Sequence, residues 1–135
     1  MTDAPAPEAL LEAVPFAREL GISLEEAAPD RVRAALGWAP ELCTVGGALH
    51  GGTLMALADT AGAVCAFLNL PPGASTATVE SKTNFFRAVR SGTVRAEAQP
   101  LHVGRSFITV RTDLRDEDGV PVGQTTQTQA VLTAG

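Results

Sequence analysis

The chain is poor in the residues that hold metal ions or disulfide frameworks. Its 135 residues include two cysteines, Cys43 and Cys65, and two histidines. Two cysteines are too few for a disulfide framework, and together with two histidines they supply no standard zinc-ligand spacing. We therefore expect reduced thiols and no metal ion.

Positive charge is also scarce. Lys and Arg total 10 against 15 Asp and Glu, which gives a formal net charge of -5 and a pI near 4.9. Contacts with nucleic-acid phosphates need clustered Lys and Arg, and the sequence contains no basic tract. The charge balance therefore excludes the nucleic-acid-binding class.

No segment has the features of a secretory signal or a membrane anchor. The N-terminal stretch MTDAPAPEALLEAV has neither a basic region nor a long apolar run. The longest apolar run, 54–70, falls just short of a membrane span, contains Asp59 and lacks flanking Lys or Arg. We expect a cytoplasmic protein without a membrane partner, in which this run is a helix buried in protein.

Apolar residues make up 45% of the chain, enough for the core of one domain. We expect that domain to cover residues 8–135, after a flexible N-terminus over residues 1–7. In PEALLEAVPFARELG the apolar positions recur at helical spacing and predict a short N-terminal helix that stops near Gly21. Pro15 ends or kinks this helix unless it begins a second turn.

Alternation of apolar and polar residues predicts about five strands. They cover residues 30–38, 76–88, 93–103, 106–115 and 120–133. Between the first two lies HGGTLMALADTAGAVCAFLNLPPG, which is apolar or small on every side and predicts one long helix. Short links between the later strands favour antiparallel pairing, so we expect an α+β fold whose sheet wraps around this helix.

Asp59 is the only charged residue between Gly51 and Leu70. Burying an isolated carboxylate costs several kcal/mol, so such a group needs a partner or a function. The functional interpretation is a catalytic carboxylate. The structural alternative is that Asp59 caps neighbouring backbone or lies on an exposed stripe of the helix.

The segment His50-Gly51-Gly52 begins the same predicted helix. The first amides of a helix lack internal acceptors and carry the positive end of its dipole, and glycine lets a ligand approach the backbone closely. They could hold an oxyanion, or the glycines could simply form a tight turn capped by His50. Gly51 and Asp59 lie about 12 Å apart along a helix axis, too far to act on one carbonyl group from a single chain. If both act, they come from two antiparallel helices at a two-fold interface.

Three blocks of sequence carry a resemblance to a known family. HGGTLMALADTAG is similar to the motif of the phenylacetate-pathway (PaaI-like) hot-dog acyl-CoA thioesterases, within the 4-hydroxybenzoyl-CoA thioesterase superfamily. TVESKTNFFRAV resembles the next block of that family, and the tripeptide at 104–106, GRS, resembles a third. The resemblance implies a hot-dog fold and a homotetramer built from two dimers. It also implies hydrolysis of aryl- or medium-chain acyl-CoA with no cofactor beyond the coenzyme A of the substrate.

The resemblance also implies roles for individual residues. The catalytic carboxylate of the family falls on Asp59, the oxyanion donor on Gly51 and the preceding histidine on His50. The hydroxyl residue beside the attacking water falls on Thr78. Many relatives carry Asn six residues before the histidine, where this chain has Thr44.

Coenzyme A is polyanionic, so an acidic protein that binds it needs local positive charge. The candidates for this positive charge are Arg87, Arg90 and Arg105. Gly104 and Ser106 flank Arg105 as in the third block, and we expect them to contact coenzyme A as well. Gly52, beside the oxyanion site, is a further candidate for contact with the substrate. The alternative for each arginine is a solvated strand end. Cys65 lies about 240° around the helix from Asp59 and is interpreted as a core residue.

Two other functions are compatible with the same fold. A hydratase or dehydratase needs an acid and a base across the acyl Cα–Cβ bond, and Asp59 is the one convincing buried titratable group in the sequence. A non-catalytic acyl-CoA sensor normally carries an output element, and no helix-turn-helix or other appended domain is predicted. The sequence therefore favours the thioesterase.

Overall fold

The computed structural model describes residues 6–133, and these begin with two short helices. They are α1 (Pro7–Glu12) and α2 (Pro15–Leu20), and each starts with a proline at the first helical position, where the missing N–H is not needed. Gly21 ends α2 with a φ of 78°. The predicted N-terminal helix is thus divided in two, because Pro15 starts a second helix, which is one of the two outcomes expected for this proline. Most of the predicted flexible segment, residues 1–5 of 1–7, lies outside the described residues.

Six strands form one antiparallel sheet in the order β1-β2-β4-β5-β6-β3. They are β1 (Ser23–Ala28), β2 (Arg31–Gly37), β3 (Ser75–Phe85), β4 (Thr93–Val103), β5 (Phe107–Arg115) and β6 (Pro121–Leu132). Five of them match the predicted strands. The additional strand is β1, where Leu24 is buried while Glu25 and Glu26 face arginines of neighbouring strands. Its sequence, SLEEAA, lacks the alternation that marks the other strands.

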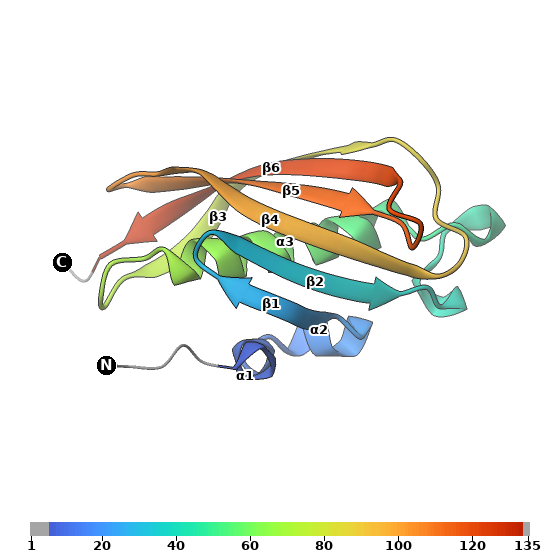
Figure 1. The fold of residues 1–135 in the computed structure, drawn as a ribbon, viewed down its shortest axis with the longest axis horizontal. Helices are drawn as coiled ribbons and strands as arrows, with labels where there is room; N and C mark the ends of the chain where they lie inside the picture. Colours follow the sequence, from blue (N-terminus) through green and yellow to red (C-terminus); the bar gives the residue numbers. More distant parts are fainter. Residues whose placement is uncertain (1–5, 134–135) are drawn as a thin grey trace.

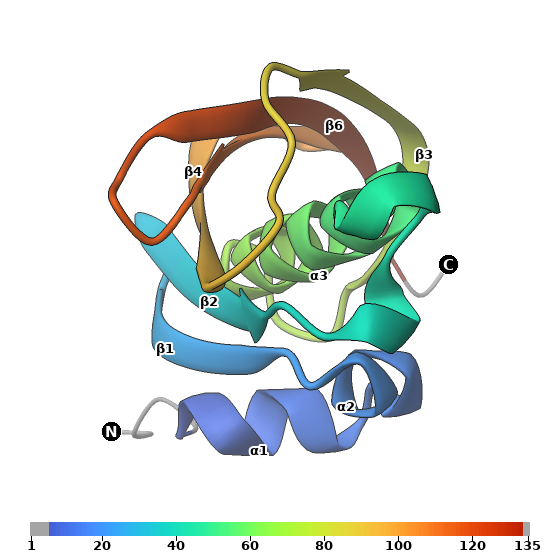
Figure 2. The ribbon, with the colours of Figure 1, turned by 90° about the vertical axis from the view of Figure 1, so that its right-hand side faces the viewer.

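The sheet curves around one long helix, α3 (Gly51–Leu68), as predicted. Figure 2 shows α3 inside the curve that runs from β1 through β2, β4 and β6 to β3, with α1 and α2 below β1. In Figure 1 the strands cross over α3, and two 3₁₀ turns, Pro40–Leu42 and Val45–Gly47, lead into it. Fully buried side chains such as Leu57 of α3 and Ile108 of β5 fill the space between helix and sheet.

The single chain covers only part of α3, which was expected to be a helix buried in protein. One face is buried against the sheet, but Gly52, Met55, Asp59 and Phe67 are exposed along the other. By length and composition α3 could cross a membrane, with a mean hydropathy of 1.4, yet half of it is buried. Burial against the sheet is typical of a core helix. The open stripe is therefore the part of α3 that this chain alone does not cover.

Strand β3 forms one edge of the sheet. It pairs with β6 on one side, and within residues 6–133 no strand pairs with its other side. Nine of its 11 residues are exposed, including Val79 at 57%. A long unpaired edge with few charges is a site where another strand can add.

Candidate functional site

The Asp59 carboxylate is held by neutral side chains from two strands. Its Oδ1 accepts hydrogen bonds from the Thr78 hydroxyl at 3.3 Å and from Nε2 of Gln127 at 3.2 Å. The other oxygen, Oδ2, has no hydrogen-bond partner within residues 6–133. Both donors belong to the paired strands β3 and β6, whose register fixes them beside α3. Asp59 is thus exposed in the single chain but oriented by the sheet.

A second layer of side chains holds Thr78. Nε2 of Gln129 donates to the Thr78 hydroxyl oxygen at 2.6 Å, and Oε1 of Gln129 accepts from the Thr76 hydroxyl at 3.1 Å. Gln127 and Gln129 are 0% and 1% exposed. Sequence reasoning missed both glutamines, because QTTQTQ is polar on both faces of β6 and alternation could not show which side faces inward.

His50 caps the start of α3 and leaves one helix amide available. Its Nδ1 accepts from the N–H of Gly52 at 2.7 Å, and its carbonyl oxygen accepts from the N–H of Thr53 at 2.9 Å. Within residues 6–133 the N–H of Gly51 donates to no protein acceptor. This free amide lies at the positive end of the helix dipole, so it can hold an oxyanion. The Gly52 amide is already occupied, so Gly52 can contribute only by close approach of its backbone.

The surroundings of Gly51 explain why it has no side chain. A Cβ built on Gly51 would lie 3.1 Å from Cζ of Phe85, closer than the ring normally allows. Gly51, Phe85, Phe86 and Arg87 line one hollow of about 440 Å³. Two of the predicted site residues, Gly51 and Arg87, are therefore neighbours at the same end of α3.

The predicted coenzyme A contacts fall into two groups within the chain. Arg87 and Arg90 follow β3 at the Gly51 end, where they share a smaller hollow with the acidic residues 116–118. Gly104, Arg105 and Ser106 form the β4–β5 turn, and the carbonyl of Ser106 accepts from the N–H of Val131 at 2.8 Å.

The register of the sheet places this turn at the Thr78 end. Phe107 pairs with Ala130, which also pairs with Ala77 of β3. The two groups of expected contacts therefore lie at opposite ends of β3.

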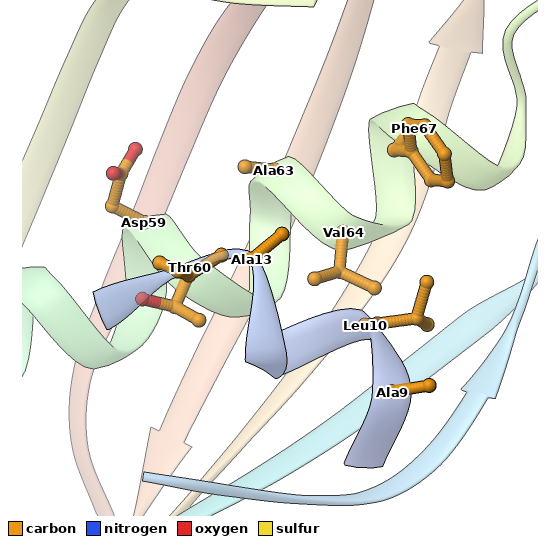
Figure 3. Close-up of a pocket in the computed structure, with 9 residues that line it drawn as sticks. Ala9, Leu10, Ala13, Asp59, Thr60, Ala63, Val64 and Phe67 are labelled. Atoms are coloured by element: carbon orange, nitrogen blue, oxygen red, sulfur yellow. The ribbon is translucent and has the colours of Figure 1, made fainter. Parts of the chain in front are cut away.

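An apolar hollow of about 370 Å³ begins at Asp59 and runs between α1 and α3. Figure 3 shows Asp59 at one end and Phe67 at the other, with Val64 between them on α3 and Leu10 on α1. The rest of the lining is Ala9, Ala13, Val14, Thr60 and Ala63. The Thr60 hydroxyl already donates to the carbonyl of Ala56 at 2.7 Å. Asp59 is the one charged residue in this lining, and the hollow suits an apolar ligand.

Cys65 has the properties of a core residue. It is 0% exposed, and burial raises the pKa of its thiol to about 11, with a smaller contribution from the charge of Asp30. The reactive form of cysteine is the thiolate, so a raised pKa makes this thiol a poor nucleophile. Within residues 6–133, no three His, Cys, Asp or Glu side chains lie close enough to hold a metal ion.

Comparison with known families identifies one match. Residues 46–122, which include α3 and β3 to β5, match the family described as the thioesterase superfamily. A protein of Mycobacterium tuberculosis named as a putative esterase is 40% identical over 106 residues, which cover 76% of this chain and 74% of that protein. The proofreading thioesterase EntH of Cronobacter sakazakii is 38% identical over 73 residues, 54% of this chain and 53% of that protein.

Solved structures with the same arrangement of elements include two similar proteins. A thioesterase from Haemophilus influenzae matches with a TM-score of 0.91 and 28% identity, over 97% of this chain and 93% of that one. The M. tuberculosis protein matches with a TM-score of 0.87 and 32% identity, over 90% of this chain and 99% of its own. The curved sheet around one helix is therefore the hot-dog fold of these proteins.

Proposed function

Because this chain belongs to the thioesterase superfamily, we propose that it hydrolyses acyl-CoA thioesters with Asp59 as the catalytic carboxylate. The observation that carries this proposal is the pair of neutral donors that fix Oδ1 of Asp59 while Oδ2 stays free, in a residue that lines an apolar hollow. The acyl group lies in the hollow, and the thioester carbonyl carbon lies next to Oδ2.

In the reaction, Oδ2 removes a proton from water as the water oxygen attacks the thioester carbonyl carbon. The carbonyl oxygen becomes an oxyanion, which the free N–H of Gly51 and the helix dipole stabilise. The carbon–sulfur bond then breaks, and coenzyme A leaves as a thiolate, which is stable enough to need no strong general acid. Thr78 orients Asp59 and the attacking water.

Direct attack by Oδ2 uses the same atoms and differs in the source of the product oxygen. A single turnover in water enriched in oxygen-18 separates the two routes. Water activation puts the label into the acid product of the first turnover. Direct attack expels the coenzyme A thiolate and leaves an anhydride between Asp59 and the acyl group. Water that opens this anhydride at the Asp59 carboxyl carbon puts the label into the protein and releases an unlabelled acid, so label in Asp59 identifies direct attack.

The spacing of the site supports a dimer, since Gly51 and Asp59 lie about 12 Å apart on one straight helix. A two-fold axis that exchanges them crosses α3 near Met55, which lies midway between them and is 39% exposed. The unpaired edge of β3 gives a consistent position. Thr78 lies beside Asp59 and Phe85 beside Gly51, so the same axis crosses β3 near Ser81. Antiparallel pairing of two β3 edges places Asp59 of one chain beside the partner's Gly51.

The same dimer unites the expected coenzyme A contacts. In one chain Arg87 and the Gly104-Arg105-Ser106 turn lie at opposite ends of β3, and a two-fold axis near the middle of β3 brings opposite ends together. Arg87 and Arg90 from one chain and Arg105 from the other then flank one coenzyme A. The acidic residues 116–118 beside Arg90 weaken its attraction for phosphate, so Arg87 and Arg105 carry most of the contact.

The substrate class follows from the lining of the hollow. Its apolar side chains fit an unsubstituted aryl or medium-chain acyl group, in line with the resemblance to the PaaI-like branch.

We place the enzyme in the cytoplasm as a homotetramer made of two such dimers, with no cofactor beyond the coenzyme A of the substrate. Thr44 lies in the loop before α3, where it donates its N–H to the carbonyl of Ala48.

The first test is thiol release from a series of acyl-CoA substrates by the wild-type protein and Asp59→Asn. We expect turnover on aryl and medium-chain substrates, and a loss of at least about 100-fold in kcat for the variant, because it lacks the base. Circular dichroism checks that the variant is folded. Retained turnover in folded Asp59→Asn overturns the proposal. Tight binding of coenzyme A with no thiol release favours a sensor.

A complementation experiment tests the shared site. Gly51→Pro removes the N–H at the first helical position, where proline is favoured, and the extended backbone of His50 (ψ 139°) tolerates a following proline. The new Cβ also pushes on the half-exposed ring of Phe85, so Gly51→Ala, which adds the same Cβ and keeps the N–H, is the control. We expect Gly51→Pro and Asp59→Asn to be inactive alone. After unfolding and refolding together in equal amounts, half of the dimers are mixed and carry one intact site of two, which restores about a quarter of wild-type activity. No recovery in verified mixed dimers contradicts a site shared between chains.

A further inference from the structure

We propose that Gln127 is a positioning residue for the reaction, which fixes the Asp59 carboxylate with Oδ2 aimed at the substrate. The inference rests on the proposed role of Asp59. Gln127 lies behind the carboxylate and contacts no proposed substrate group. It acts through Asp59 by holding Oδ1 in place.

The geometry defines one orientation of the carboxylate. Oδ1 receives two donors from the sheet, the Thr78 hydroxyl and Nε2 of Gln127, at 3.3 and 3.2 Å. Two donors on one oxygen fix both the position of the carboxyl group and its rotation, and they leave the second oxygen for chemistry. Gln129 holds Thr78 in turn, at 2.6 Å, so both donors are anchored in β6.

Gln127 is held more rigidly than Thr78. Its side chain is fully buried, while Thr78 is exposed on the edge strand. The glutamine carbonyl lies against Gly62, where an added Cβ would be only 2.0 Å from Oε1. Gly62 is therefore small because the Gln127 amide occupies the space beside α3.

Stability alone does not explain a glutamine at this position. Oε1 of Gln127 is buried and has no hydrogen-bond partner within residues 6–133. A buried acceptor without a partner is destabilising, and an apolar side chain of similar shape would avoid this penalty. The gain from the amide is the hydrogen bond that its N–H group makes to Asp59, and this bond serves orientation at the site.

The chain offers a matched control on the same strand. Nε2 of Gln124 donates to Oδ1 of Asp113 at 2.8 Å, which is also a glutamine-to-aspartate hydrogen bond. It joins β6 to β5 and does not contact the Asp59 network. Gln127→Met and Gln124→Met therefore remove the same kind of bond with the same change of side chain.

The experiment measures kcat and KM for Gln127→Met, Gln124→Met and Asp59→Asn, with thermal midpoints for all three. Small displacements of a reacting group lower rates steeply, so we expect Gln127→Met to lower kcat about 10- to 100-fold with KM within about twofold of wild type. Gln124→Met keeps wild-type kcat. Equal kcat for folded Gln127→Met and the wild type overturns the positioning role, even if Asp59→Asn is inactive.

A double variant separates positioning from a general loss of structure. If Gln127 acts only through Asp59, adding Gln127→Met to Asp59→Asn leaves the residual rate of Asp59→Asn unchanged, because the group to be positioned is already gone. A further drop of about tenfold or more contradicts the inference. Full activity of Asp59→Asn instead defeats the proposed function itself, so the two failures are distinguishable.

Discussion

Gly62→Ala is the sharpest perturbation of the Asp59 network, because it adds one methyl group and touches neither Asp59 nor the substrate. The new Cβ would lie 2.0 Å from Oε1 and 2.5 Å from Cδ of Gln127, so the glutamine must move. Gln127 is fully buried, and it cannot move away from α3 and keep its 3.2 Å bond to Asp59. The substitution therefore breaks this bond without changing Gln127 itself.

The expected loss of stability is modest. Loss of a hydrogen bond to a charged group costs about 1.5–3 kcal/mol. Replacing glycine by alanine inside a helix returns about 1 kcal/mol. The net destabilisation is about 0.5–2 kcal/mol, which lowers the thermal midpoint of a domain of this size by about 2–8 °C. The folded state thus persists at assay temperature, and kcat can be measured.

The activity of Gly62→Ala should fall although the protein stays folded. We expect kcat about 10- to 100-fold below wild type at unchanged KM, as for Gln127→Met. Gly37→Ala is the control, because a Cβ on Gly37 meets nothing within 4 Å and its φ is not positive. It should keep full activity. Wild-type kcat in Gly62→Ala, with the expected drop in thermal midpoint, would refute the reasoning that ties Gln127 to catalysis.

Three further predictions concern the interface, the hollow and the core. Met55→Glu places a charge on the proposed two-fold axis, so the protein should become monomeric and inactive. A variant that is dimeric in analytical ultracentrifugation and active in thiol release argues against that axis. In the wild-type protein, kcat/KM should rise about fourfold for each methylene added to the acyl chain until the hollow is full. Ala13→Phe should shorten the longest acyl chain that is accepted and leave the activity on acetyl-CoA unchanged. Glu12→Phe, outside the lining, should not shorten the longest accepted chain. The pKa of the Cys65 thiol is raised from 9.0 to about 11, so the unfolded chain loses this proton first. Stability should therefore hold below pH 9 and fall by about 1.4 kcal/mol per pH unit between pH 9 and 11 in denaturant titrations, and Cys65→Ala should lack this slope.

The sequence predicted those elements whose pattern is local. Alternation marks β2, β4 and β5, because each side chain there faces either the core or solvent of the same chain, and the long apolar run marks α3. Strand β1 has no such pattern. Its SLEEAA sequence is held as a strand by pairing with β2 and by the burial of Leu24. Its identity as a strand is therefore set by tertiary contacts.

The candidate site was predictable in part for a similar reason. Asp59 and Gly51 stand out because a charge and a glycine pair interrupt an apolar helix. Gln127 and Gln129 do not stand out, because β6 carries polar residues on both faces and its register with β3 decides which ones reach Asp59. The open stripe of α3 was also hidden. A helix that is apolar all round looks the same in sequence whether its own chain or a second chain covers it.

The donors around Asp59 also separate hydrolysis from the other reactions that this fold supports. Hydration or dehydration needs an acid and a base on the two sides of the acyl Cα–Cβ bond, but the side chains that contact Asp59 are the neutral Thr78 and Gln127. Nδ1 of His50 is occupied by the N–H of Gly52. A site that only binds the thioester has no need for an ionised carboxylate with one oxygen free, whereas general-base catalysis does. In the proposed dimer the oriented carboxylate of one chain activates water, and the free helix amide of the partner stabilises the negative charge that appears on the carbonyl oxygen, as thioester hydrolysis requires.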